Sequence, residues 1–332
     1  MNDVEFYHKA QEFLYQLSHD LESAGLKLEP HWDIDHICYR SDSEDHYKTL
    51  KNSFEAFGRL LIESEVNGRL ISTFKLFTPI LFQEWRIDLV ELPAPKSGKM
   101  TVPGFEHIEI VCDEPFEVLM ERYKKFPLVT KGLQKDYNQE LEIEFGERNL
   151  KFHHSSLASV INMELNQKVW NAISDSQILK HFKSLHPLIA GTFPLSVNLS
   201  TSDVDVLLHS DNLASMEKNL KELYSNQPDF EITKSEVDGL PTLICQFCWD
   251  QVPFEVFAQN RHPVEQKAYR HFLVEERLLK LGGDDFFQKI LSARADGLKT
   301  ELAFGKVLDL QNDPYEELLT LQQLPNRLLP VV

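Results

Sequence analysis

The sequence has little of what would mark an exported, membrane-bound or nucleic-acid-coating protein. Four cysteines among 332 residues are too few for a disulfide framework, so a reducing cytoplasm is the expected location. No stretch approaches the roughly 18 consecutive apolar residues that a membrane helix needs. Basic residues are also scarce, since 34 Lys and Arg stand against 52 Asp and Glu, for a net charge of −18. Duplex nucleic acid and anionic membranes are therefore not expected partners, whereas nucleotides and small metabolites are.

The composition that remains is that of an ordinary folded protein, with 42% hydrophobic and 26% charged residues. The start, through Ala24, has early acids and the pattern of an amphipathic helix rather than of an export signal. The length exceeds what one hydrophobic core usually serves. We therefore expect an α+β protein of two domains, residues 1–172 and 173–332.

The first half repeats one order of elements. Its first copy predicts a strand, a helix and three strands, at residues 35–40, 45–58, 58–66, 68–77 and 85–93. Asn67-Gly68 predicts a hairpin turn. After a Pro-rich joint, the second copy predicts the same order at residues 105–111, 114–126, 138–146, 148–154 and 159–165. An Asp-His-Ile or Glu-His-Ile triplet opens each copy, and a repeated order is a stronger signal than any single element.

Alternation along these strands predicts a polar cavity. Neighbouring residues of a strand face opposite sides, so four of the strands have an apolar face for the helices and a polar face away from them. Each polar face carries an imidazole or a carboxylate: His36, Glu91, His107 and Glu164. Arg40 and Glu109 share the same faces as His36 and His107.

Three stretches, "DHICYR", "VELPAPK" and "PGFEHIEIV", resemble the YecM family of the vicinal oxygen chelate superfamily, which includes glyoxalases, epimerases and extradiol dioxygenases. The resemblance covers roughly residues 1–170 and implies paired βαβββ modules that form a glyoxalase-like half-barrel around one divalent ion. The implied ligands lie on the first and last strands of each module: His36, Glu91, His107 and Glu164. Mn, Fe, Ni or Zn suits this donor set and would polarise a small-molecule ligand. Glu109 would be the base and Arg40 the anion anchor.

The alternative is that the module has lost its metal. His36 and His107 would then be ordinary half-buried histidines, and the superfamily includes metal-free binding proteins. Ligating residue types fill all four positions, which favours a metal site.

The second half predicts a smaller α/β domain with a helical end. The stretch "LIAGTFPLSVNLSTSDVDVLL" closes on a strand, and a helix and three strands follow at residues 211–226, 229–237, 240–249 and 252–259. Asp238-Gly239 and Asp250-Gln251 predict the turns between these strands. From about residue 262 the pattern is helical, with a break at Gly282-Gly283.

Three acids lie on strands of this half. Asp203 and Asp205 are at i and i+2 and so point to the same side, and Glu255 opens a second strand. Such acids can hold two divalent ions about 4 Å apart, the arrangement of two-metal phosphoryl chemistry, in which Glu255 would complete the site of the ion that activates the attacking hydroxyl. The alternative is a solvated sheet edge that carries charge to block pairing.

One stretch resembles the signature of the nucleotidyltransferase superfamily: Gly191-Thr192, ten further residues and then Asp-Val-Asp-Val. The stretches "PFEVFAQNRHPVEQKAYRH" and "GLKTELAFGKVLDLQNDPYEELL" are similar to an uncharacterised nucleotidyltransferase-like family, over residues 173–325. The resemblance implies a helical C-terminal cap and a triphosphate bound by backbone N–H groups at Gly191 and Thr192. Thr192 replaces the usual Gly or Ser. The expected nucleotide contacts in the cap are Tyr269, Arg270 and Lys299.

Three functions follow from these observations. The leading one is transfer of a nucleotidyl group from an NTP to an unknown hydroxyl acceptor, with Mg²⁺ at Asp203, Asp205 and Glu255, in a chain that also holds one transition metal in its first half. The second is a non-catalytic metabolite sensor or scaffold. The third is a metal-dependent isomerase or lyase in the first half.

Overall fold

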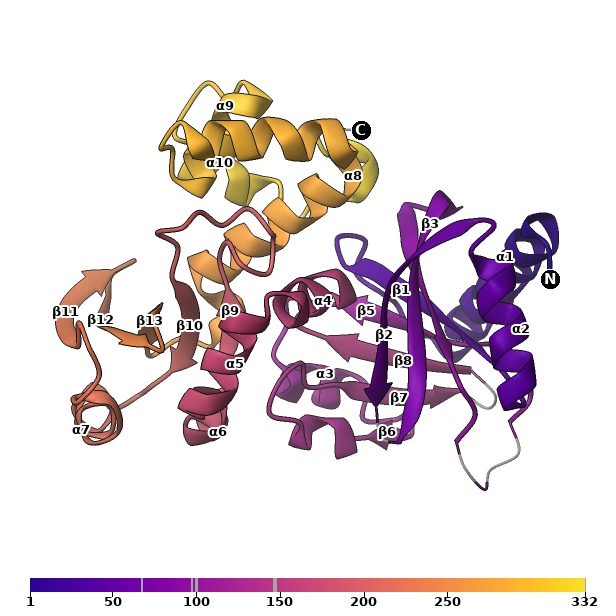
Figure 1. The fold of residues 1–332 in the computed structure, drawn as a ribbon, viewed down its shortest axis with the longest axis horizontal. Helices are drawn as coiled ribbons and strands as arrows, with labels where there is room; N and C mark the ends of the chain where they lie inside the picture. Colours follow the sequence, from indigo (N-terminus) through magenta and orange to yellow (C-terminus); the bar gives the residue numbers. More distant parts are fainter. Residues whose placement is uncertain (67, 97, 99–100, 146–147, 332) are drawn as a thin grey trace. The chain divides into compact units, whose positions relative to one another are not determined.

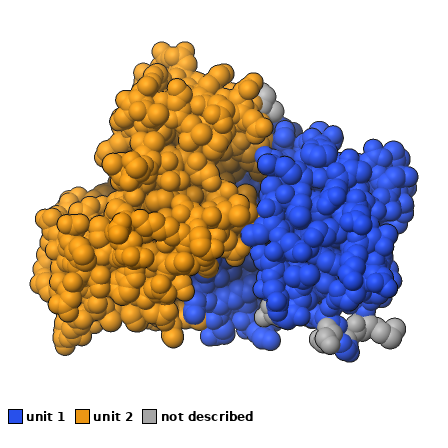
Figure 2. All heavy atoms as spheres, viewed as in Figure 1, with its two compact units in different colours: residues 1–112, 116–157, 325–327 blue, residues 113–115, 158–324, 328–332 orange. Residues whose placement is uncertain are grey.

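The computed structural model describes residues 1–66, 68–96, 98, 101–145 and 148–331, in two compact units (Figures 1 and 2). Unit 1 consists of residues 1–112, 116–157 and 325–327, and unit 2 of residues 113–115, 158–324 and 328–332. The chain passes between them after Leu157, whereas the predicted domain boundary lies within helix α5 (Gln167–Ser176). Among the described residues, no helix has both the length and the apolar character to cross a membrane.

Unit 1 contains an eight-stranded sheet in the order β2-β3-β4-β1-β5-β8-β7-β6. Its strands are β1 (Asp33–Arg40), β2 (Gly58–Val66), β3 (Arg69–Phe82), β4 (Trp85–Pro93), β5 (Gly104–Val111), β6 (Leu128–Val129), β7 (Leu141–Phe145) and β8 (Arg148–His153). Its helices are α1 (Asp3–Ala24), α2 (Glu44–Phe54), α3 (Phe116–Arg122) and the 3₁₀ turn η1 (Lys131–Gln134). The order is strand, helix, three strands, twice. From the central β1–β5 pair, each half of the sheet runs outward through the last, the middle and the first of its three later strands. Most of these strands are labelled in Figure 1. The predicted βαβββ repeat is confirmed.

The strand predicted at residues 159–165 is wrong, because helix α4 (Leu157–Leu165) occupies this stretch. Ile161 and Met163 are buried and alternate as in a strand, but a short apolar run does not by itself distinguish helix from strand. The stretch contains Leu, Met and Glu, which favour a helix. The two-residue strand β6 supplies the missing strand of the second module. Asn67 of the predicted hairpin turn lies outside the described residues, and Gly68 has φ +75°.

The core of unit 1 fixes the direction of the polar side chains. Ile37, Val90, Ile108 and Leu150 pair across the four central strands and are at most 1% exposed. They belong to one apolar cluster with residues of α1 and α2 such as Phe6 and Phe54. Because side chains alternate along a strand, the neighbours of these four residues point to the opposite face of the sheet.

Unit 2 contains a five-stranded sheet in the order β11-β12-β13-β10-β9. The strands are β9 (Leu188–Ala190), β10 (Val204–His209), β11 (Glu231–Val237), β12 (Leu240–Trp249) and β13 (Val252–Gln259). Besides α4 and α5, its helices are α6 (Ile178–His181), α7 (Leu213–Tyr224), α8 (Lys267–Ala295), α9 (Thr300–Leu308) and α10 (Pro314–Thr320), and short 3₁₀ turns lie at η2 (Lys183–Leu185) and η3 (Pro263–Glu265). The 3₁₀ turn η4 (Asn326–Leu328) lies near the end of the chain. The class is α+β with a helical end, as predicted.

The turns and the break of unit 2 follow the sequence signals. Both residues of each predicted turn, Asp238-Gly239 and Asp250-Gln251, have φ between +45° and +71°, which the right-handed twist of a tight hairpin requires. Gly283 interrupts α8 with φ +66° and ψ −165°, a conformation that is essentially limited to glycine.

Candidate metal centre and carboxylate site

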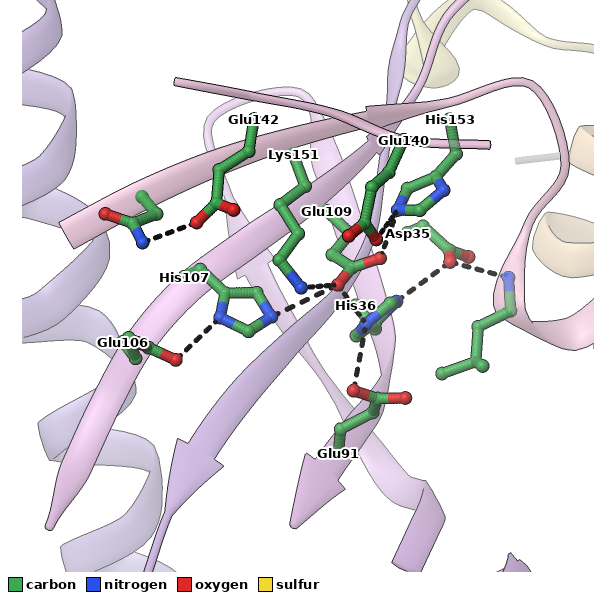
Figure 3. A network of polar contacts seen from close by, with 12 residues as sticks. Asp35, His36, Glu91, Glu106, His107, Glu109, Glu140, Glu142, Lys151 and His153 are labelled. Carbon is green, nitrogen blue, oxygen red and sulfur yellow. Dashed lines mark hydrogen bonds and ion pairs between the residues drawn. The ribbon is translucent and has the colours of Figure 1, made fainter. Parts of the chain in front are cut away.

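Four donor side chains lie together on the polar face of the unit 1 sheet (Figure 3). They are His36, Glu91, His107 and Glu109, and their donor atoms all lie within 4.8 Å of one another. His36 Nε2 is 3.7 Å from Glu91 Oε2 and 3.6 Å from Glu109 Oε1, and His107 Nε2 is 3.1 Å from Glu109 Oε1. The structure thus brings together three of the four residues predicted as ligands.

Glu164, the fourth predicted ligand, is not among these donors. It lies on helix α4 in unit 2, because the last strand of the second module is β8 and not residues 159–165. Glu109, which the sequence suggested as a base, completes the group instead.

The strand pairing explains this exchange. In the first module, Glu91 on β4 lies opposite Cys38, which is two residues after His36 on β1. In the second module, Lys151 on β8 lies opposite Glu109, which is two residues after His107 on β5. Lys151 is therefore the counterpart of Glu91 in the second module. The second module has a lysine where the first has a carboxylate, and a carboxylate where the first has a cysteine. Two imidazoles and two carboxylates remain, but three of the four come from β1 and β5.

Each imidazole is oriented by the acid that precedes it. His36 Nδ1 is 2.9 Å from Asp35 Oδ2, and His107 Nδ1 is 2.9 Å from Glu106 Oε2. A carboxylate on one ring nitrogen fixes the tautomer and directs the other nitrogen to a metal. Sequence reasoning missed these two acids as site residues, although the triplets that open both modules contain them. Arg40, the predicted anion anchor, is ion-paired with Glu106.

Charge holds this cluster together. Burial lowers the pKa of His36, but the charge of Glu109 and the contacts with Asp35 and Glu91 raise it well above its usual value. Burial raises the pKa of Glu109, and the charges of Lys151, His153 and His36 more than offset this and hold it well below its usual value.

The donor set fits a divalent ion. His36 Nε2 is buried and has no hydrogen-bond partner in the part of the chain that the structure describes. An orphaned imidazole nitrogen between two carboxylates can serve as a metal ligand, and imidazole with carboxylate suits Mn, Fe, Ni or Zn.

The acids of unit 2 converge from neighbouring strands. β10 and β13 are parallel, and Asp205 and Glu255 are direct partners across the pair. Asp203 lies just before β10, so only Asp205 of the predicted pair is within the strand. Burial and then the charges of Asp203 and Glu255 raise the pKa of Asp205 well above its usual value. In the donor groups that could hold a metal ion among the described residues, the ligand atoms all lie within 4.8 Å of one another. The oxygens of these three acids do not meet this distance.

Gly191 lies against the Asp205 carboxylate. It follows β9 and has φ +77°, and a Cβ at this position would lie 1.8 Å from Asp205 Oδ2. Glycine is thus required twice, by the backbone conformation and by the close approach. Thr192 is half-buried, and its carbonyl accepts a hydrogen bond from Val197 N–H.

The three predicted nucleotide contacts differ in their surroundings. Tyr269 is fully buried in unit 2. Arg270 Nε donates to Gln322 Oε1 at 2.6 Å. Lys299 is exposed. Burial and the charge of Asp203 raise the pKa of Glu255, and the charge of Lys299 lowers it. Of the three, Lys299 is electrostatically linked to the strand acids.

Two further acids belong to this region. Glu275 on α8 is 3% exposed. Its burial and the charges of Glu301 on α9 and of Asp205 raise its pKa well above its usual value, although the charge of Arg294 lowers it. Within the described ranges, no Lys or Arg forms an ion pair with Asp203, Asp205, Glu255 or Glu275. No pattern in the sequence pointed to Glu275, because an acid in a charged helix ordinarily lies on a solvated face.

Glu109→Gln is expected to lower the free energy of unfolding by about 3–5 kcal/mol, because Lys151 and its neighbours stay buried without their counter-charge. Urea unfolding of the metal-free protein at pH 7 measures this. Since the pKa of Glu109 is lowered in the folded state, its contribution is present above the unfolded value and is lost as the pH falls below about 4.

The matched control is Glu121→Gln, whose pair with Lys124 is exposed to 73% and 70% and should contribute nothing measurable. Equal effects of the two substitutions would contradict the buried network.

Two family models match the chain: "YecM protein" at residues 2–164 and "Domain of unknown function (DUF4269)" at residues 171–321. Protein YecM of Escherichia coli K12 is 30% identical over 168 residues, which cover 46% of this chain and 88% of that protein. An uncharacterized protein of Haemophilus influenzae is 37% identical over 111 residues, which cover 30% of this chain and 58% of that protein.

A solved structure of Cid1, whose title names an RNA terminal uridylyl transferase activity, matches 44% of this chain and 47% of its own at 14% identity and a TM-score of 0.31. This likeness concerns the fold alone.

The match to the Escherichia coli protein spans nearly its whole length. The chain therefore belongs to the YecM family through its first half, and its second half matches the DUF4269 model.

Proposed function

We propose that unit 2 transfers a nucleotidyl group from an NTP to a hydroxyl acceptor, with two Mg²⁺ held by Asp203, Asp205 and Glu255. The observation that supports this most is the parallel pairing of β10 and β13, which sets Asp205 directly opposite Glu255. Gly191, which has no Cβ, leaves room for the Asp205 carboxylate. Bound Mg²⁺ would supply charge stabilisation for phosphoryl transfer. Acids without a paired Lys or Arg favour the uptake of such cations.

The residues of the chain would divide the remaining work. Asp205, which is packed against Gly191, would be held in one position for the metals, and Glu255 would bind the ion next to the incoming hydroxyl. Lys299 would face the phosphate charge. The net charge of −18 favours a small or protein acceptor over bulk nucleic acid. The four cysteines are free thiols, which agrees with the cytoplasmic location that we propose.

The test is transfer of label from α-labelled ATP, GTP, CTP and UTP to acceptors in a small-molecule and protein extract, with Mg²⁺. Asp205→Asn and Glu255→Gln are expected to reduce transfer by at least about 100-fold, an effect typical of lost charge stabilisation. Gly191→Ala keeps every acid but displaces Asp205, and we expect at least a tenfold loss.

Asp211→Asn is the matched control, because Asp211 is exposed just beyond the same strand. Its rate should equal that of the wild type. Absence of transfer from all four nucleotides, or full activity of Asp205→Asn, would overturn the proposal.

We propose further that unit 1 binds one divalent transition metal through His36, Glu91, His107 and Glu109. The orphaned His36 Nε2 and the acid behind each imidazole support this. The proposal takes Glu109 in place of Glu164. Such an ion would polarise a carbonyl or hydroxyl of a small molecule, and an isomerase or lyase reaction fits this chemistry.

Metal affinity of this centre is expected to rise with pH. The pKa values of His36 and His107 lie well above their usual range, so both imidazoles hold protons in the metal-free protein and must release them to bind an ion. Calorimetric titration with Zn²⁺ at pH 6, 7 and 8 should show up to about a tenfold gain per pH unit for each proton released.

His36→Ala and His107→Ala should each remove this binding event. His8→Ala, at an exposed histidine of α1, is the control. Affinity that is independent of pH, or unchanged metal content in His36→Ala, would count against the centre.

A further inference from the structure

The Glu109 carboxylate lies between two groups of donors (Figure 3). Its Oε1 is 3.1 Å from His107 Nε2 and 2.8 Å from Lys151 Nζ, and 3.6 Å from His36 Nε2. Its Oε2 contacts His153 Nε2. A carboxylate that faces two donor groups with its two oxygens has the arrangement of a bridging ligand in a two-metal site.

The second donor group is complete enough to hold an ion. Donor atoms of Glu109, Glu140 and His153 lie within 4.8 Å of one another. His153 is 4% exposed, and its Nδ1 has no hydrogen-bond partner among the residues described. Glu140 Oε2 is 3.9 Å from His153 Nε2 and accepts a hydrogen bond from Lys135 Nζ at 2.8 Å. On ligand type alone, this would be a second cation site beside the first.

The charges decide against a second metal ion. The carboxylates at ion-pair distance from the three imidazoles are Asp35, Glu91, Glu106, Glu109 and Glu140. The cations paired with these carboxylates are Arg40, Lys135 and Lys151. Five negative and three positive formal charges leave two negative charges when the imidazoles are neutral. One divalent ion balances them, and a second would leave two unbalanced positive charges in a buried place.

Lys151 lies where the repeat would otherwise place a carboxylate. Its partner across the strands is Glu109, as the partner of Glu91 is Cys38. We infer that Lys151 is a resident cation that takes the place of a second metal ion and limits this cavity to one divalent ion. The inference rests on the single-ion centre proposed above.

This assignment restricts the chemistry of the cavity. A two-metal mechanism, in which one ion activates a nucleophile and another the leaving group, is excluded while the ammonium is in place. What remains is a single ion that polarises its ligand, beside a fixed monovalent charge. Lys151 is thus a specificity-determining residue for the metal content, and it does not itself bind the ion.

The experiment compares Co²⁺ stoichiometry in metal-free full-length protein by equilibrium dialysis, with excess Mg²⁺ to occupy unit 2. Lys151→Gln is expected to bind one more Co²⁺ per chain than the wild type. The double variant Lys151→Gln/His153→Ala should lose this additional ion. Lys124→Gln removes an exposed cation outside this group, and its stoichiometry should equal that of the wild type.

Each outcome has one meaning. A folded Lys151→Gln protein with the wild-type stoichiometry overturns the inference, whereas unchanged Co²⁺ binding in His36→Ala overturns the single-ion centre itself. If Lys151→Gln does not fold, the electron paramagnetic resonance of Asp205→Asn/Glu255→Gln with saturating Mn²⁺ decides, because this variant keeps the unit 1 cavity and removes the carboxylates proposed to hold metal ions in unit 2. We expect only the six-line signal of isolated ions, and the signal of an exchange-coupled pair would contradict us.

Discussion

Balance of the negative charge on buried and half-buried carboxylates is the constraint on which both sites depend. Carboxylates rarely stay buried unless a cation or hydrogen-bond donors compensate them. In unit 1 the compensation is built in, since Lys151 contacts Glu109 and three imidazoles surround it. In unit 2 the strand acids and Glu275 lack a paired Lys or Arg among the described residues. On the proposals above, the first site therefore has room for one ion, and the second depends on cations from outside.

The two sheets deliver their side chains by the same rule. In unit 1 the apolar row of Ile37, Val90, Ile108 and Leu150 faces the helices, and alternation sends the donors to the other face. In unit 2 the buried Val204 and Val206 flank Asp205 along β10, and Phe254 and Val256 flank Glu255 along β13, so alternation sends both acids to the other face of this sheet. Pairing between neighbouring strands then decides which donors meet, and this step places Lys151 opposite Glu109.

The sequence predicted most of the strands and part of each site. Strong turn signals bounded β12 and β13, whose limits were predicted correctly, and the repeated triplet located His36 and His107. Residues 159–165 were misassigned because alternation over one short run does not separate helix from strand, and Glu164 was misplaced with them. Lys151 and Glu275 could not be found, because their meaning depends on strand pairing and on the packing of a helix, which one sequence does not reveal.

We propose for both units that carboxylates in excess of their paired cations hold divalent ions. Crystals soaked in Mn²⁺ and measured at the manganese absorption edge test it most directly. We expect one anomalous peak among His36, Glu91, His107 and Glu109, and at least one beside Asp205 and Glu255. Well-ordered side chains at both places without any peak would contradict it.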